Sequence, residues 1–166
     1  MGRAKGKEMI TIGMSLDLAP THTGLVVWHD ETPIYHTRYT AKTPLEMALK
    51  TIEYIKEDDP DWVAIEDCYY GKNIKNFGMT KWLIGYLVGY CLVMGPKVFV
   101  GLTATIDSAC DIQHKDRKTH TRTLAELMFP DEKLSEDECD AVAIGLWGYG
   151  VSKTTEWTNL DKTGNV

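Results

Sequence analysis

Four acidic residues occupy positions where a folded chain can bring their carboxylates together. Asp17 ends a stretch of alternating apolar residues, and Glu66 ends a short continuous apolar stretch. Asp137 and Asp140 lie three residues apart, just ahead of the apolar run AVAIGLW. Residues at this spacing share one face of a helix, so both side chains point the same way. Four carboxylates gathered in a low-dielectric site repel one another strongly.

A divalent cation is the expected neutralising partner, because no run of Lys or Arg lies next to these acids in the sequence. Carboxylate oxygens are the ligands that Mg²⁺ and Mn²⁺ prefer. A carboxylate cluster of this kind can hold two ions roughly 4 Å apart, which activate water and stabilise the leaving oxygen in phosphodiester cleavage. We therefore expect two Mg²⁺ ions per site, with Mn²⁺ able to substitute.

Each acid taken alone has an ordinary structural explanation. Asp137 would lie in a first helical turn, where the helix dipole favours acids. Asp17 could form a turn, and Glu66 could be a surface acid at the end of a strand. Asp140 is harder to explain, because a lone carboxylate just before an apolar run is poorly placed without a partner. The four together indicate a site.

The elements that must position these acids follow from hydrophobic periodicity. Period-two and continuous apolar stretches predict strands, and apolar residues three and four apart predict helices behind capping boxes at Thr43 and Ser135. The predicted strands are 10–17, 24–30, 34–40, 62–66 and 98–102; the predicted helices are 45–57, 77–94, 119–128 and 135–147.

This order predicts an α/β domain with a mixed five-stranded sheet, three antiparallel strands first and parallel strands added later, flanked by helices. Asp17 and Glu66 then end neighbouring strands. The helix over 77–94 is apolar on every side and needs two partners, the sheet and a second copy of the chain. Residues 1–150 are expected to form one domain, and residues 151–166 a polar, flexible tail.

Composition limits the class of protein. A chain of 166 residues, 43% hydrophobic and 25% charged, suits one well-cored domain. No apolar run reaches the roughly 18 residues of a membrane span, and no signal-peptide pattern is present. The four cysteines form no CxxC pair, so we expect reduced thiols and neither disulfides nor a zinc site. A cytoplasmic location, in a bacterial cell or a phage-infected host, is the expectation.

The net charge of −6 is unevenly distributed. Residues 68–125 carry eight Lys and Arg against three Asp, which gives +5, so the remainder carries −11. One face can therefore bind a polyanion although the whole chain is acidic.

The acids and their surroundings resemble the RuvC family of Holliday junction resolvases, which belongs to the ribonuclease H-like nucleases. The matching segments are SLDLAPTHTGLVVW around Asp17, VAIEDCYYGKN around Glu66, and EDECDAVAIGL around Asp137 and Asp140. The resemblance covers about residues 11–147 and implies a ribonuclease H-like fold. It also implies a homodimer, formed through the helix over 77–94, that nicks opposed strands of a four-way DNA junction with Mg²⁺ and leaves 5′-phosphate and 3′-hydroxyl ends.

The resemblance also implies which residues contact DNA. An aromatic side chain that enters the junction centre matches Tyr69, with Tyr70 beside it, and stacking on bases suits either. A basic residue near the scissile phosphate matches one of three neighbours, and we assign a catalytic role to Lys118, with Arg117 as the alternative. The full predicted DNA-binding set is Tyr69, Tyr70, Lys72, Asn73, Lys75, Lys115, Arg117 and Lys118.

The sequence departs from the family near Ile106 and Asp107, where a basic residue is expected and none is present. Three other functions stay open: a general structure-selective nuclease for branched DNA, a non-catalytic junction-binding protein, and an actin-like kinase or ATPase. The last requires a second domain for which this length leaves no room, so we expect no nucleotide cofactor.

Overall fold

The structure, a computed structural model, describes residues 10–68 and 74–154. Its elements are β1 (Ile12–Leu18), β2 (His22–His29), β3 (Thr32–Thr40), α1 (Pro44–Asp58), β4 (Trp62–Asp67), α2 (Ile74–Met94), β5 (Lys97–Leu102), α3 (Thr103–Ala109), the 3₁₀ turn η1 (His114–Asp116), α4 (Arg117–Met128) and α5 (Glu136–Thr154).

The five strands form one sheet in the order β3-β2-β1-β4-β5. β1 pairs antiparallel with β2, and β2 pairs antiparallel with β3. β4 adds parallel to β1, and β5 adds parallel to β4. The predicted mixed sheet, with antiparallel strands first and parallel strands later, is confirmed.

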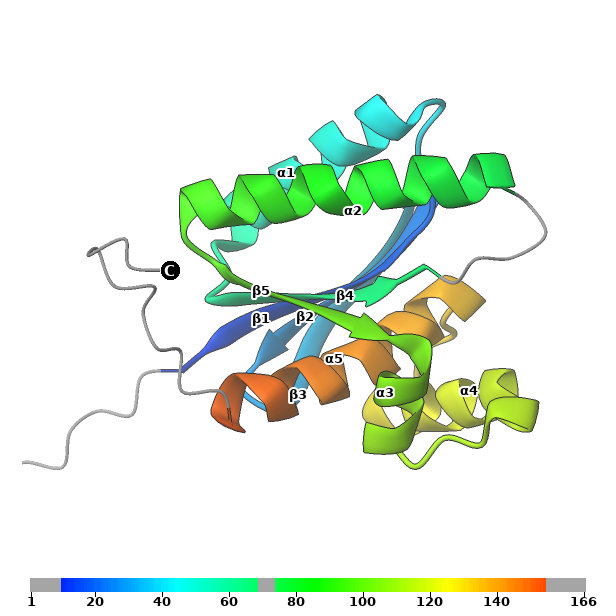
Figure 1. The fold of residues 1–166 in the computed structure, drawn as a ribbon. Coiled ribbons are helices and arrows are strands. Elements are labelled where there is room, and N and C mark those ends of the chain that lie inside the picture. Colours follow the sequence, from blue (N-terminus) through cyan, green and yellow to red (C-terminus); the bar gives the residue numbers. More distant parts are fainter. Residues whose placement is uncertain (1–9, 69–73, 155–166) are drawn as a thin grey trace, which may run out of the picture.

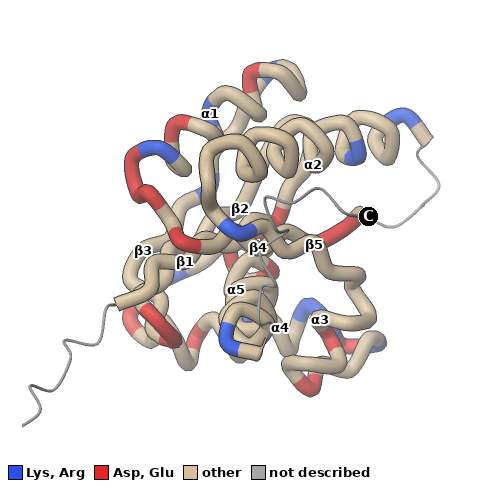
Figure 2. The backbone as a smooth tube through the Cα atoms, turned by 60° about the vertical axis from the view of Figure 1, so that its left-hand side comes forward, with Lys and Arg blue, Asp and Glu red and all other residues tan. Residues whose placement is uncertain are grey.

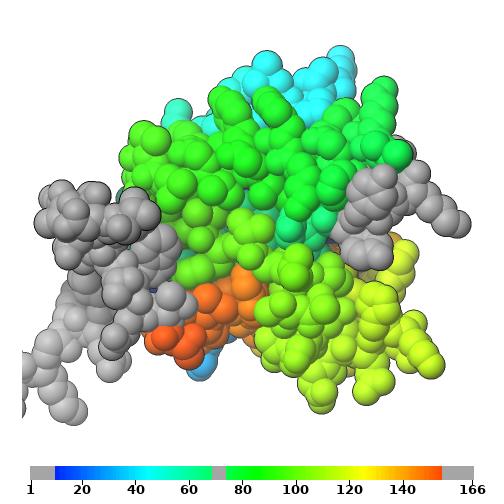
Figure 3. Space-filling model, in the orientation of Figure 1, coloured from blue at the N-terminus to red at the C-terminus, as the bar shows by residue number. Residues whose placement is uncertain are grey.

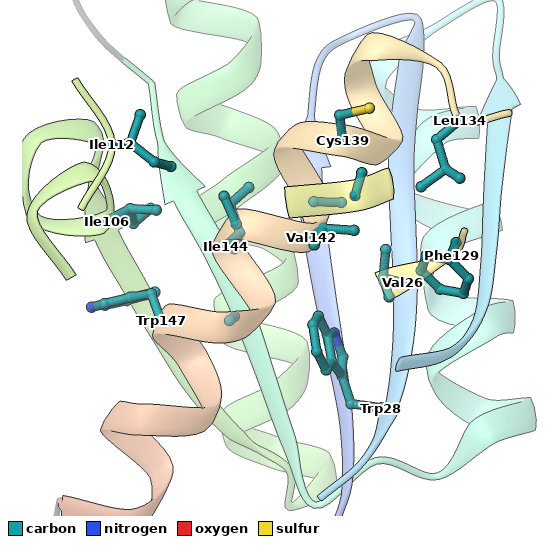
Figure 4. Close-up of a cluster of buried hydrophobic side chains, with 14 of the residues drawn as sticks. Val26, Trp28, Ile106, Ile112, Phe129, Leu134, Cys139, Val142, Ile144 and Trp147 are labelled. Carbon is teal, nitrogen blue, oxygen red and sulfur yellow. The ribbon is translucent and has the colours of Figure 1, made fainter. Parts of the chain in front are cut away.

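Helices cover both faces of the sheet (Figure 1). α1 and α2 lie on one face, where their apolar side chains pack with Met14, Leu16 and Val63. α5 lies on the other face beside α3 and α4, and its side chains contact Val26 and Trp28 of β2 (Figure 4). The alternation along each strand sends successive side chains to opposite layers, so the central strands are buried on both sides.

The two predicted capping motifs start α1 and α5. The Thr43 hydroxyl accepts a hydrogen bond from the Glu46 amide at 3.1 Å, and Pro44 follows at the first helical position. At α5, the Glu138 carboxylate accepts from the Ser135 amide at 2.8 Å, and the Ser135 hydroxyl accepts from the Glu138 amide at 3.4 Å. These local signals fix where both helices begin.

Several elements differ from the sequence prediction: β2, β3 and α4 each begin two residues earlier than predicted, at His22, Thr32 and Arg117. α3 was not predicted, because it is short and Leu102, the residue before it, makes no side-chain capping bond. α2 begins at Ile74 instead of residue 77. α5 continues to Thr154, beyond the predicted end near Trp147, because Val151 still packs against the core. The predicted flexible tail over 151–166 is therefore wrong for residues 151–154, which are helical, while residues 155–166 lie outside the described part.

α2 is buried on one side and exposed on the other. Leu83, Leu87 and Cys91 pack inward, whereas Trp82 and Tyr86 stack on each other at the surface with ring centroids 5.3 Å apart. Figure 3 shows α2 uncovered along the front of the molecule. By length and composition alone α2 could cross a membrane, a test that a core helix packed against a sheet also passes.

Candidate functional site

Asp17 and Glu66 lie side by side at one edge of the sheet. Leu16 of β1 is paired with Ile65 of β4, so the two acids follow at the next position of neighbouring parallel strands. Ser15 points toward α5, where its hydroxyl bonds Ala141, and Asp17 lies two residues further along on the same face of the strand. Glu66, beside Asp17 on the neighbouring strand, therefore also faces α5. The strand register therefore places these two carboxylates next to each other, as predicted.

The first turns of α5 bring the other two acids to the same edge. The Ser15 hydroxyl donates to the Ala141 carbonyl at 2.7 Å and accepts from the Trp28 indole at 2.9 Å, which ties α5 to β1 and β2. Asp140 precedes this anchor directly. Gly24 of β2 leaves the space in which the backbone of Asp137 sits.

The raised pKa of Asp17 is consistent with four carboxylates lying close together. Burial raises the pKa of the Asp17 carboxyl well above its usual value, and the charges of Asp140, Glu66 and Asp137 raise it further. Arg117 opposes the rise only weakly by comparison. The other three predicted acids therefore lie close enough for their charges to act on Asp17, although the four come from three separate segments of the chain.

Arg117, the first residue of α4, lies among these carboxylates. One terminal nitrogen donates to both oxygens of Glu66 at 2.9 and 3.1 Å, and the other lies 3.6 Å from Asp140. Its Nε donates to Asp107 of α3 at 2.8 Å. Burial disfavours the charged guanidinium, but the hydrogen bond to Asp107 and the charges of the acids raise the pKa of Arg117 overall. Arg117 is therefore a permanent cation inside the site.

A second arginine neutralises Asp137. Arg38 of β3 donates from Nε to Asp137 at 2.5 Å, and a ring nitrogen of His22 lies 3.7 Å from the other oxygen. The sheet register explains the contact, because Gly24 lies between Asp17 and Arg38 in one cross-strand row. No Lys or Arg run adjoins the acids in the sequence, and the fold brings two arginines to them from distant positions.

Burial is also the main cause of the raised pKa of Glu66, opposed by a hydrogen bond from Thr103 and by Arg117. The pKa of Asp140 is raised in the same way by burial, opposed by Arg117 and by a hydrogen bond from Thr121. An open pocket of about 210 Å³ adjoins the acids, and Asp17, Glu66, Asp67 and Thr103 line it with Leu18 and Cys68. Solvent ions can reach Asp17 and Glu66 through this pocket.

The donor set suits a hard divalent cation. Asp17 is a half-buried carboxylate that lines the pocket and makes no hydrogen bond or ion pair with the described residues, and its neighbours supply further carboxylate oxygens of the kind that Mg²⁺ binds. In the arrangement shown, no three His, Cys, Asp or Glu side chains of residues 10–68 and 74–154 converge on one ion position. Arg117 donates to Glu66 and lies 3.6 Å from Asp140 in this arrangement.

The structure separates the predicted basic residues. Lys118, assigned a catalytic role from the sequence, points to solvent and pairs with Glu136 at 2.9 Å, while its neighbour Arg117 enters the acidic site. Lys75 and Lys115 are exposed at α2 and η1. Basic and acidic positions are mixed over α3 and α4, whereas α2 carries lysines and no acid (Figure 2). The remaining predicted DNA contacts, Tyr69, Tyr70, Lys72 and Asn73, lie outside the described residues.

Two residues of the site were missed as functional from the sequence. Asp107 is 5% exposed, and its second oxygen, Oδ2, is buried without a hydrogen-bond donor among the described residues. Asp107 stands near the position where the resemblance leads us to expect a basic residue, and this departure could have marked it as a site residue. Nothing in the sequence indicated Arg117 as its partner. Arg38 lies on a polar strand with no distinguishing pattern, so only the pairing of β3 with β2 reveals it.

Solved structures share this fold. Thermus thermophilus RuvC in complex with Holliday junction substrate matches with a TM-score of 0.69 and 15% identity over 86% of this chain and 95% of that one. The Fowlpox virus resolvase, in complex with Holliday junction DNA, gives 0.57 and 13% over 87% and 100%. The yeast mitochondrial Holliday junction resolvase Ydc2 gives 0.62 and 11% over 84% and 80%. No family model matches the sequence, and no curated protein does. The resemblance to RuvC expected from the sequence is confirmed for the fold.

Proposed function

We propose that the protein is a metal-dependent endodeoxyribonuclease that resolves four-way DNA junctions. The observation that supports this most is the convergence of Asp17, Glu66, Asp137 and Asp140 at one sheet edge, recorded in the raised pKa of Asp17. The fold is shared with proteins whose structures contain Holliday junction DNA. A match in both acids and fold favours hydrolysis of junction phosphodiesters by paired nicks, leaving 5′-phosphate and 3′-hydroxyl ends.

The four acids would hold Mg²⁺ or Mn²⁺, two ions per site. Bound there, the ions would supply the Lewis acidity that activates water and stabilises a leaving oxygen. The chain itself contributes a guanidinium: Arg117 is oriented by Asp107 beside the acids, where it can stabilise charge that develops on phosphoryl oxygens. We therefore give Arg117 the role that the sequence prediction gave to Lys118.

DNA would approach across the pocket at the acids. Lys75, Lys115 and Lys118 are exposed lysines, and Lys118 would exchange its ion pair with Glu136 for a phosphate. Such contacts position a duplex without reading its sequence. We keep Tyr69 and Tyr70 as the proposed stacking residues at the junction centre, with Lys72 and Asn73 beside them.

A second copy of the chain would pack against α2. Its outward face exposes large apolar side chains in one row, with Trp82 47% and Val93 83% exposed. Leu45 of α1 adjoins Trp82 across an open apolar pocket of about 340 Å³. Exposed apolar surface of this kind marks interaction sites, and a dimer would supply the two active sites that paired nicks require.

The test is cleavage of a labelled mobile four-way junction with Mg²⁺, with Mn²⁺ and with EDTA, beside fork, flap and linear duplex substrates of the same sequence. We expect paired nicks in the junction only when the metal is present, ligatable products, and loss of cleavage in Asp140→Asn. Cleavage of forks and flaps at the same rate would replace junction specificity with general branched-DNA cleavage.

The pairing of the acids with Arg117 and Arg38 favours a second candidate, a non-catalytic junction-binding protein. Carboxylates repel phosphate unless they are neutralised, and here arginines neutralise three of the four without metal. Tight junction binding with no cleavage in Mn²⁺ would support this candidate and contradict the nuclease.

A further inference from the structure

Arg117 occupies the position among the carboxylates where a cation is needed. It contacts both oxygens of Glu66 and lies 3.6 Å from Asp140, so a divalent ion that takes Glu66 as ligand must displace this guanidinium or share the oxygens with it. Sharing is unfavourable, because the ion and the guanidinium are both positive and the site is largely buried. Arginine and metal therefore compete for the same oxygens.

Asp107 holds Arg117 from the side away from Glu66. Its Oδ1 accepts from Arg117 Nε at 2.8 Å, and its side chain is only 7% exposed. The planar guanidinium has its donors in a rigid fork, so the hydrogen bond at Nε limits how far the two terminal nitrogens can move. Asp107 Oδ2 has no hydrogen-bond donor among the described residues, and its nearest ring nitrogen, on His114, is 3.7 Å away. Arg117 is thus the one described hydrogen-bonding partner of the Asp107 carboxylate.

We propose that Arg117, positioned by Asp107, is the resident counter-ion of the acidic site and competes with the divalent cation for Glu66 and Asp140. Asp107 acts as a positioning residue, since among the described residues Arg117 is its link to the site. In the absence of metal the arginine stabilises the carboxylates; when a cation binds, the guanidinium moves off Glu66 and remains tethered at the rim of the site. The proposal rests on the metal site of the proposed function.

Calorimetric titration of the metal-free protein with Mn²⁺, at fixed ionic strength and without DNA, tests it. Arg117→Gln removes the competitor, so we expect binding about 10-fold tighter than in the wild type. Asp107→Asn weakens the tether, so binding should tighten about threefold. Simple loss of a negative charge near the site would weaken binding instead, so the sign of the Asp107→Asn effect separates positioning from bulk electrostatics.

Arg122→Gln is the matched control, because it removes a positive charge from the same helix, α4, and Arg122 makes no ion pair with Asp17, Glu66, Asp137 or Asp140. It should change affinity by less than about twofold. Arg117→Lys keeps the charge but loses the Nε donor to Asp107 and should lie between Arg117→Gln and the wild type. Circular dichroism confirms that each variant folds. If Arg117→Gln does not fold, Arg117→Lys decides the question alone.

Unchanged or weaker Mn²⁺ binding in Arg117→Gln would overturn the competition, and weaker binding in Asp107→Asn would overturn the positioning role. Either result could occur in a protein whose wild type binds Mn²⁺ and cleaves junctions, so the proposed function would stand. A wild type that neither binds Mn²⁺ nor cleaves junctions would instead remove the proposed function, and this inference with it.

Discussion

Gly24 on β2 lies directly beneath Asp137 at the start of α5: a Cβ built on Gly24 would lie 2.2 Å from the Asp137 carbonyl oxygen. No real Cβ approaches backbone so closely, so the glycine is what allows the N-terminus of α5 to rest on the sheet. The position of Asp137 therefore depends on Gly24 having no side chain, although the two residues are more than one hundred positions apart in the sequence.

Gly24→Ala is therefore expected to destabilise the protein by about 2 kcal/mol or more, because backbone on both sides must shift. Urea unfolding measures the loss, and junction cleavage should fall with it as Asp137 is displaced. Gly150→Ala, on the helix α5 that carries Asp137, is the control. Nothing lies near its added methyl group, so this variant should be neutral or stabilise the protein by up to about 1 kcal/mol. Equal effects of the two variants would contradict the contact.

Asp17→Asn should stabilise the metal-free protein. Burial and three neighbouring acids raise the pKa of Asp17, which means that its ionised form at neutral pH costs folding free energy. We expect the free energy of unfolding at pH 7 in EDTA to rise by on the order of 1 kcal/mol. The same variant should lose most of the increase in Tm that millimolar Mn²⁺ gives the wild type.

Asp131→Asn, at an exposed acid outside the site, is the control and should stay within about 0.5 kcal/mol of the wild type. A destabilised Asp17→Asn protein in EDTA would show that the carboxylate makes favourable contacts and is not crowded by the other acids.

His36 is expected to make stability depend on pH. Its two ring nitrogens bind Glu138 and Glu132, each at 2.7 Å. Burial alone would lower its pKa, but these two carboxylates raise it above the ordinary 6.5. The imidazolium therefore stabilises the fold fully below pH 6.5, and this contribution is lost as the pH rises through the raised value.

The His36→Gln variant should be less stable than the wild type by about 2 kcal/mol near pH 5.5, because charge-assisted hydrogen bonds are lost. The difference should shrink as the pH rises to 8. Urea unfolding across this range measures it, with His29→Gln at an exposed position as the control. A difference that grows with pH would show that His36 is neutral in the native state.

Trp82→Glu should dissociate the proposed dimer. Trp82 stacks on Tyr86 in the middle of the exposed apolar face of α2, and a buried charge at such a position weakens association by at least about 30-fold. Light scattering coupled to size exclusion measures the mass over a range of concentrations. Leu127→Glu on α4, where an exposed leucine stands apart from α2, is the control. A wild type that stays monomeric at the highest concentration would remove this interface.

The sequence determined the elements whose signals are local. Period-two strands, the capping boxes at Thr43 and Ser135, and the helical spacing before Trp147 each act within a few residues, so the five strands and the principal helices could be predicted. The four acids could be named as well, because carboxylates at strand ends and before an apolar run are unusual in themselves. α3 was not predicted, because it is short and no side chain caps it.

Only the tertiary structure decided which cations meet those acids. Arg117 and Lys118 are adjacent in sequence, yet they point about 100° apart around a helix, so the way α4 packs on α5 sends one into the site and the other to Glu136. Arg38 reaches Asp137 because β3 pairs in register with β2. Strand register and helix rotation are set by packing between segments distant in the chain, and no local pattern encodes them.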